Sequence, residues 1–286
     1  MPLRRSRPRI AAALALLAGV AAAAHTAGPA PLKVGMVPDA GATQVSVAEK
    51  APLQDYLARR LGRPVELVIP TNYNATVEGL GNGSLDIAYL GGLTYVKAHA
   101  RYGVVPLVQR DIDTRFHALL IAHAGSGIRE LADLKGRTFC FGDINSTSGH
   151  LAPAMIFRER GLDPARDFKS ARYTGSHPAT AQAVATGACD AGSIDETVWK
   201  SLNDEGKLPA GAAQVFYISK PFADYVWAAR KDVDPRTRQA FAQALIALRP
   251  GADDRVLTIL RGQRYLPAAD ARYGAIARIA RQLGLL

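Results

Sequence analysis

The sequence contains only two cysteines, Cys140 and Cys189, among 286 residues. Neither belongs to a C-x-x-C pair and no paired histidines accompany them, so the sequence predicts no metal site. No run rich in lysine and arginine carries interleaved aromatic residues, which argues against nucleic-acid binding. Beyond the N-terminus, no hydrophobic run is long enough to cross a membrane. We therefore expect a globular protein without a metal, a cofactor or a nucleic-acid partner.

The N-terminal segment Met1–Ala24 has the features of a secretory signal peptide. Four arginines precede an apolar stretch from Ile10 to Ala23, and small residues offer a cleavage position within 24–31. The stretch is short for a membrane span, and no cysteine follows it that could carry a lipid anchor. Its removal lowers the formal net charge from +10 to about +6, because it holds four arginines. We expect a soluble exported protein whose remaining excess of base could steer an anionic ligand.

Export leads to an oxidising compartment, where Cys140 and Cys189 can form one disulfide if their strands are neighbours. Each cysteine also fits as a small buried apolar residue. The sequence slightly favours the disulfide and leaves both possibilities open.

Strand-like and helix-like segments alternate along the chain from Leu32 onward. Short β-favouring runs are followed by polar loops and then by apolar residues at helical spacing. The alternation predicts two successive doubly wound α/β patterns with parallel strands, followed by helices at 236–248, 252–259 and 268–283. Ligands of such sheets bind outside the carboxyl ends of the strands. Polar and aromatic residues that follow strands are expected to face one cleft: Tyr73, the segment 91–95, Ser146–Ser148, His177 and Asp195.

The segment Arg137–His150 reads R-T-F-C-F-G-D-I-N-S-T-S-G-H and predicts a buried strand, a polar loop and the start of a helix. Ser146, Thr147 and Ser148 come just before apolar residues at helical spacing, so they lie at a helix N-terminus. Free N–H groups, a partial positive charge and three hydroxyls meet there, which favours binding of a tetrahedral oxyanion. An ordinary capped helix is the alternative.

Several motifs together resemble one known family. They are L-K-V-G-M-V-P at 32–38, T-N-Y-N-A at 71–75, G-S-L-D-I-A-Y-L-G-G-L-T-Y-V at 83–96, the stretch 131–153 around S-T-S-G, and Y-T-G-S-H-P-A-T at 173–180. The chain is similar to the periplasmic solute-binding proteins of phosphonate and phosphite ABC transporters, from about Leu32 to its end. It departs from a frequent Gly-Pro of that family by carrying Gly91-Gly92.

The resemblance implies a type II periplasmic binding protein fold, with two α/β lobes joined by extended crossovers near 116–122 and 219–226. Lobe one would comprise 32–117 and 225–286, and lobe two would comprise 118–224. The ligand would be trapped between the lobes when they close about the hinge.

The resemblance also implies a set of ligand contacts. Hydroxyls and amides of Ser146, Thr147 and Ser148 would bind the oxyanion, and His177 would donate to a second oxygen. An acid, either Asp195 or its neighbour Glu196, would accept a hydrogen bond from a P–OH group. The predicted set is Tyr73, Tyr95, Ser146, Thr147, Ser148, His177 and Asp195. The purely structural alternatives are helix capping for the histidine and the aspartate, and core packing for the tyrosines.

The implied function is a monomeric periplasmic binding protein without catalysis, which delivers a phosphonate, phosphite or related phosphorus oxyanion to a membrane ABC permease. Two other functions remain open at this point. One is a ligand-sensing protein that works with a membrane signalling partner. The other is a phosphoryl hydrolase with Ser146 as its nucleophile, for which no general base is evident in the sequence.

Overall fold

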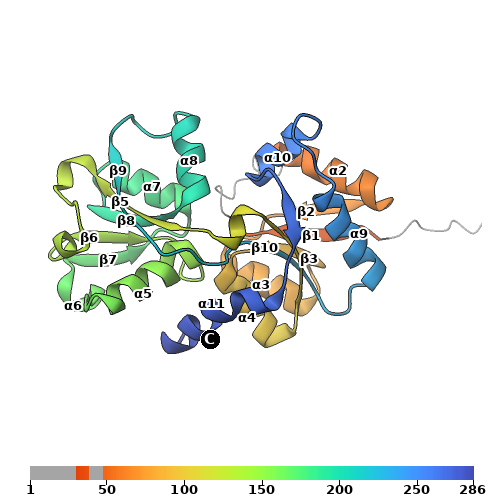
Figure 1. Cartoon of the computed structure of the whole chain (residues 1–286), viewed down its shortest axis with the longest axis horizontal. Coiled ribbons are helices and arrows are strands. Elements are labelled where there is room, and N and C mark those ends of the chain that lie inside the picture. The colour runs from red at the N-terminus through yellow and green to blue at the C-terminus, as the bar shows by residue number, and fades with distance from the viewer. Residues whose placement is uncertain (1–29, 39–47) are drawn as a thin grey trace, which may run out of the picture.

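The computed structural model describes residues 30–38 and 48–286, so the predicted signal peptide lies outside the described residues. Two separate sheets, each flanked by helices, form two lobes that lie side by side (Figure 1). The first sheet has the order β11-β4-β10-β3-β1-β2, and the second has the order β7-β6-β8-β5-β9. The chain enters lobe two after β4 and returns to lobe one at β10, so lobe one is built from both ends of the sequence.

Lobe one contains six strands and its own set of helices. Its strands are β1 (Leu32–Met36), β2 (Val65–Val68), β3 (Ile87–Leu90), β4 (Val105–Arg110), β10 (Val226–Ala229) and β11 (Tyr265–Pro267). Its helices are α2 (Ala51–Leu61), α3 (Tyr73–Asn82), α4 (Gly92–Tyr102), α9 (Pro235–Ile246), α10 (Asp254–Leu260) and α11 (Gly274–Gln282), with short 3₁₀ turns η1 (Ile112–Thr114) and η5 (Asp270–Tyr273).

Lobe two contains five strands and shorter helices. Its strands are β5 (Ala118–His123), β6 (Thr138–Phe141), β7 (Ser170–Tyr173), β8 (Ala191–Asp195) and β9 (Ala213–Ile218). Its helices are α5 (Ala152–Glu159), α6 (Pro164–Asp167), α7 (His177–Ala185) and α8 (Glu196–Asp204), with the 3₁₀ turns η2 (Ala124–Ser126) and η3 (Leu131–Leu134) and the π turn η4 (Thr147–Leu151).

The predicted parallel order holds only for part of each sheet. Strands β2-β1-β3 and β7-β6-β8 are parallel, as their helical crossovers require. Strand β10 instead runs antiparallel to β3 and β4, and β5 runs antiparallel to β8 and β9. Both sheets are therefore mixed, because β5 and β10 enter their sheets directly from the crossovers, without a helix that reverses the chain.

Two further predictions from periodicity are corrected. The predicted helix 268–283 is divided into a coil after β11, the turn η5 and the helix α11. Strand β11 was not expected, and it pairs with β4 at the edge of the first sheet. Helical spacing also predicts a helix at 128–134, and the structure has only the short turn η3 there. A residue pattern shows which side chains are apolar, but it does not show where the tertiary fold interrupts a helix.

The lobes meet at two chain crossings. Phe116 and Phe222 form an isolated antiparallel bridge between the crossing segments, and their rings lie 6.1 Å apart. The C-terminal helix α11 lies below the junction of the lobes in Figure 1. It reaches lobe two through Arg158, whose Nη1 donates to the carbonyl of Gln282 at 2.8 Å. No helix of the described residues is long and apolar enough to cross a membrane.

Candidate ligand-binding site between the two lobes

The hydroxyl-rich turn after β6 is fully formed in the structure. The Asp143 carboxylate accepts the backbone N–H of Asn145 at 2.7 Å, and the Asp143 carbonyl accepts the N–H of Ser146 at 2.9 Å. Ser146 is the N-cap of η4, and its Oγ accepts the N–H of Gly149 at 3.0 Å. The side chains of Ser146, Thr147 and Ser148 are buried. The turn thus combines a helix N-terminus with three hydroxyls shielded from solvent.

His177 lies directly beside these hydroxyls. It is the first residue of α7, which Ser176 caps. Its Nε2 lies 3.4 Å from both the Ser146 and the Ser148 hydroxyl oxygens. The backbone N–H of Asp195 donates to the Nδ1 atom at 3.4 Å, so the neutral ring carries its proton on Nε2. In that tautomer His177 donates toward the serine oxygens.

Asp195 ends β8 and caps α8. Its Oδ1 accepts the N–H groups of Thr197 and Val198 at 2.6 and 2.9 Å. Its Oδ2 is buried and has no hydrogen-bond partner among the described residues. Burial raises the pKa of this carboxyl, but His177 and two arginines outweigh it, so the pKa lies below its usual value. Asp195 thus presents one ionised oxygen that the protein leaves unsatisfied.

Glu196, the alternative to Asp195, is bonded to His117. Its Oε1 accepts the backbone N–H of His117 at 2.8 Å, and Oε2 lies 3.3 Å from the Nδ1 of the same histidine. Glu196 therefore binds the residue that precedes β5.

Lobe one contributes the N-terminus of α4. The N–H of Gly92 donates to the Asp224 carboxylate at 2.7 Å, and the N–H of Leu93 donates to the Thr147 hydroxyl at 3.0 Å. The second bond crosses from one lobe to the other. A proline at position 92 would lack the donor, and a Cβ there would lie 3.0 Å from the carbonyl of Ala223. The Gly91-Gly92 pair is thus the feature that lets Asp224 dock on α4.

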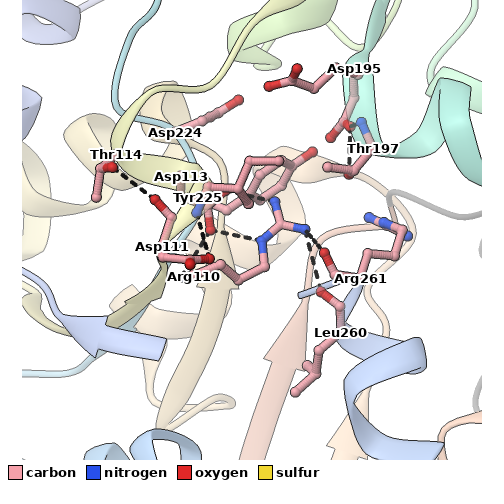
Figure 2. Close-up of polar contacts among 12 residues, drawn as sticks. Arg110, Asp111, Asp113, Thr114, Asp195, Thr197, Asp224, Tyr225, Leu260 and Arg261 are labelled. Carbon is pink, nitrogen blue, oxygen red and sulfur yellow. Dashed lines mark hydrogen bonds and ion pairs between the residues drawn. The ribbon is translucent and has the colours of Figure 1, made fainter. Parts of the chain in front are cut away.

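Asp224 is the second buried carboxyl of the site. Figure 2 shows it near Asp195, above the side chain of Tyr225. Burial raises its pKa well above the usual value, and the neighbouring charges of Asp195 and Asp113 raise it further. The two aspartates therefore have pKa values shifted in opposite directions. The surroundings thus favour the ionised form of Asp195 and the protonated form of Asp224.

A buried ion pair lies beneath these aspartates. Arg110 at the end of β4 binds Asp113 through Nη2 at 2.6 Å and Nε at 2.8 Å (Figure 2). Its Nη1 donates to the carbonyls of Leu260 and Arg261. Both charged side chains are wholly buried. The Arg110 charge is therefore neutralised within lobe one and serves mainly to hold η1 and α10 together.

Four helical segments thus begin at one place between the lobes, namely α4, η4, α7 and α8. We call this place the interlobe site and define it by Gly92, Ser146–Ser148, His177, Asp195 and Asp224. Its N–H groups, hydroxyls and imidazole are donors, and each helix N-terminus adds partial positive charge. The carboxyls of Asp195 and Asp224 are the acidic groups among these donors. Such a set suits an oxyanion that also carries one hydroxyl.

Comparison with known proteins decides the family. Residues 34–273 match the family described as the phosphonate ABC transporter, periplasmic substrate-binding protein. The chain belongs to this family. Like others of the family, this phosphonate-transporter binding protein has the two-lobed α/β fold of periplasmic binding proteins.

Relatives of this binding protein come from several bacteria. The probable ABC transporter phosphite binding protein PhnD1 of Prochlorococcus marinus is 29% identical over 270 residues, which are 89% of this chain and 90% of the relative. The solved structure of that PhnD1 in complex with methylphosphonate has a TM-score of 0.83 and 27% identity, and the match covers 89% of this chain and 98% of the other. The phosphate-import protein PhnD of Mycolicibacterium smegmatis is 32% identical over 67% of this chain and 65% of the relative.

Five of the seven predicted contacts meet in the interlobe site, and both tyrosines belong to lobe one. Tyr73 is the first residue of α3 and is buried in the core of lobe one. Tyr95 lies in the first turns of α4, where its hydroxyl donates to Asp270 at 2.7 Å and its ring packs on Tyr273. Their contact with a ligand stays a prediction.

Sequence reasoning missed Asp224 and the α4 N–H groups. The available signal for Asp224 was weak, because it is a single acid within the apolar crossover P-F-A-D-Y-V-W. Backbone donors have no residue type that would identify them. Among residues 30–38 and 48–286, no three histidine, cysteine or acidic side chains are grouped so that they could hold a metal ion.

Proposed function

We propose that this protein captures a small phosphorus oxyanion, such as phosphite or methylphosphonate, between its lobes and presents it to a membrane ABC permease. The observation that carries the proposal is the convergence of four helix N-termini, three buried hydroxyls and a donating imidazole. Phosphite and methylphosphonate, the ligands named for the Prochlorococcus relative, are small tetrahedral oxyanions.

The two aspartates give the ligand a required protonation state. The unsatisfied Oδ2 of Asp195 accepts a hydrogen bond from a P–OH group, whereas it would repel a fully deprotonated oxygen. The raised pKa of Asp224 favours its protonated form, which can donate to the ligand. The proposed ligand is therefore a monoanion that retains one hydroxyl, bound by Ser146, Thr147, Ser148, His177 and Asp195. We also propose that Tyr73 and Tyr95 line the wall of the ligand pocket.

The proposal includes the assignment of residues to the two lobes. Lobe one consists of 32–117 with 225–286, lobe two of 118–224, and the lobes rotate about the crossing at Phe116 and Phe222. We further propose that the mature protein is a periplasmic monomer and that it performs no chemistry. The tautomer of His177 supports the last point, because a ring that donates from Nε2 does not activate Ser146 as a nucleophile.

Binding is tested by a thermal-shift screen of the mature protein with phosphite, methylphosphonate, aminoethylphosphonate, phosphate and sulfate. A ligand that binds only the folded protein raises the melting temperature by mass action. We expect phosphite or methylphosphonate to give the largest rise. Absence of a rise with every phosphorus compound would refute the proposed function, and release of phosphate from phosphomonoesters would favour the hydrolase.

The role of the hydroxyl turn is tested by Ser146→Ala. Loss of one hydrogen bond to a charged ligand costs roughly 1.5–3 kcal/mol, which is about ten- to a hundredfold in affinity. Calorimetry below the melting temperature measures this change apart from the loss of the helix cap. Ser170→Ala is the matched control, because Ser170 lies exposed on β7. Equal affinities of the Ser146 variant and the control would contradict the assignment.

A further inference from the structure

Lys97 makes a direct contact from lobe one to the hydroxyl turn of lobe two. It lies on α4, one turn beyond Leu93, and its Nζ donates to Asn145 Oδ1 at 2.6 Å. Asn145 precedes the cap residue Ser146 and is itself buried. The side chain of Lys97 therefore crosses the lobe boundary at the edge of the interlobe site, and its partner is a neutral amide.

The turn that carries Asn145 is held by contacts within lobe two. The Asp143 carboxylate accepts the N–H of Asn145, and the carbonyl of Ile144 is bonded by Nδ1 of His150 at 2.7 Å. Nε2 of His150 lies 2.9 Å from the hydroxyl of Tyr173. These contacts are all within lobe two, so they persist when the lobes separate. The Asn145 side chain is then left as a preformed acceptor that faces lobe one.

The positive charge of Lys97 also affects groups in the hydroxyl turn. Burial lowers the pKa of Lys97, and the nearby Asp143 raises it. The Lys97 ammonium also helps to lower the pKa of His150, which lies at the end of the hydroxyl turn. A partly buried positive charge is thus held close to the helix N-terminus that we assign to the oxyanion, while Arg110 is neutralised by Asp113.

We propose that Lys97 is an interlobe latch: its ammonium binds Asn145 only when the lobes are closed, and so stabilises the ligand-holding state. The two residues belong to different lobes, and the only chain connections between the lobes are the hinge segments. Rotation about the hinge therefore breaks this bond while both partners stay intact. A contact present in one state alone shifts the population toward that state and improves apparent affinity by the same factor.

The ligand part of this inference rests on the proposed function, whereas the closure part does not. The central variant is Lys97→Met, which keeps most of the apolar stem and removes the ammonium. We expect the affinity for phosphite or methylphosphonate to fall roughly tenfold, the loss expected for one charge-assisted hydrogen bond. Most of the fall should lie in the dissociation rate, because the latch acts after the ligand has entered.

Three companion variants make the test specific. Lys97→Arg keeps a positive donor and should recover part of the affinity. Asn145→Ala should reproduce the loss, and the double variant should be no worse than either single variant, because both remove one bond. Lys200→Met is the control, since Lys200 pairs with Asp204 on the exposed face of α8. Additive losses in the double variant would overturn the latch.

Closure is measured without ligand by small-angle X-ray scattering. If Lys97 stabilises the closed state, Lys97→Met has a larger radius of gyration than the Lys200→Met control when both are ligand-free. Equal radii together with equal affinities would overturn the inference. If the wild-type protein bound no phosphorus compound, the proposed function would fail, and the scattering comparison would still decide the role of Lys97.

Discussion

Two buried aspartates at the interlobe site have pKa values shifted in opposite directions because their surroundings differ. Asp195 sits at the N-terminus of α8 beside His177, which favours its ionised form. Asp224 is equally buried but lies near two other carboxyls, and this favours its neutral form.

Asp224 should make the protein less stable as pH rises. Its folded pKa is raised, so above the unfolded pKa of about 4 the folded state holds a proton that the unfolded chain has released. Stability is therefore lost as pH rises toward the folded pKa. Asp224→Asn keeps an acceptor for Gly92 and removes this titration. We expect the variant to be more stable than wild type at neutral pH, by a margin that grows as pH rises above the unfolded pKa.

Urea unfolding of both proteins between pH 4.5 and 8 measures this difference. Asp113, whose pKa burial raises to about 6, titrates in both proteins. It therefore lowers the stability of both proteins in the same way as pH rises. The quantity to compare is the difference in unfolding free energy between the two proteins, which should increase with pH. Parallel curves would mean that Asp224 is ionised in the folded protein.

At the scale of elements, the disulfide between Cys140 and Cys189 confirms the pairing that the sequence slightly favoured. It links β6 to the turn before β8 across 49 residues, and both sulfur atoms are buried. The linked segment contains the hydroxyl turn and α7 with His177. The bond therefore closes the part of lobe two that supplies most of the oxyanion donors.

Replacing both cysteines with alanine should destabilise lobe two. For a closed loop of this length the chain-entropy estimate is about 4 kcal/mol, and removal of native disulfides costs about 2–5 kcal/mol. Urea unfolding of the double variant measures the loss. Dithiothreitol should destabilise the wild type by a similar amount and leave the variant unchanged. An unaffected wild type under reducing conditions would show that the bond is absent in solution.

At the scale of the whole molecule, the contacts between lobes lie on both sides of the interlobe site. Thr147 meets Leu93 and Lys97 meets Asn145 at α4, while Arg158 meets the end of α11. Between α5 and α11 there is an apolar cavity of about 250 Å³, lined by residues of both lobes and the second crossover. The interface beside the hinge is loosely packed, which lowers the cost of opening it.

We expect the ligand-free protein to populate a more open form than the ligand-bound protein. The interlobe site is buried in the structure, so a ligand needs an open state to enter and leave. Small-angle scattering with and without saturating phosphite should show a smaller radius of gyration in the bound state. Superimposable scattering curves, at a concentration where calorimetry shows binding, would contradict closure.

The sequence by itself determined the features that depend on neighbouring residues. Strand runs, cap residues and helical spacing located β6, η4, α7 and β8, because these signals act over one or two turns. The resemblance to the family then led to Ser146–Ser148, His177 and Asp195. Helix capping by Asp195, the alternative interpretation, does not conflict with a site role, since its Oδ1 caps the helix and its Oδ2 has no hydrogen-bond partner among the described residues.

Only the tertiary structure decided which distant segments complete the site. Asp224 meets Gly92 across 132 positions of sequence, and Lys97 meets Asn145 across 48. The antiparallel insertion of β10 between β3 and β4 brings the second crossover and its aspartate to α4. Strand order, lobe closure and the pKa of a buried acid all depend on packing between residues far apart in the chain, and no local pattern encodes that packing.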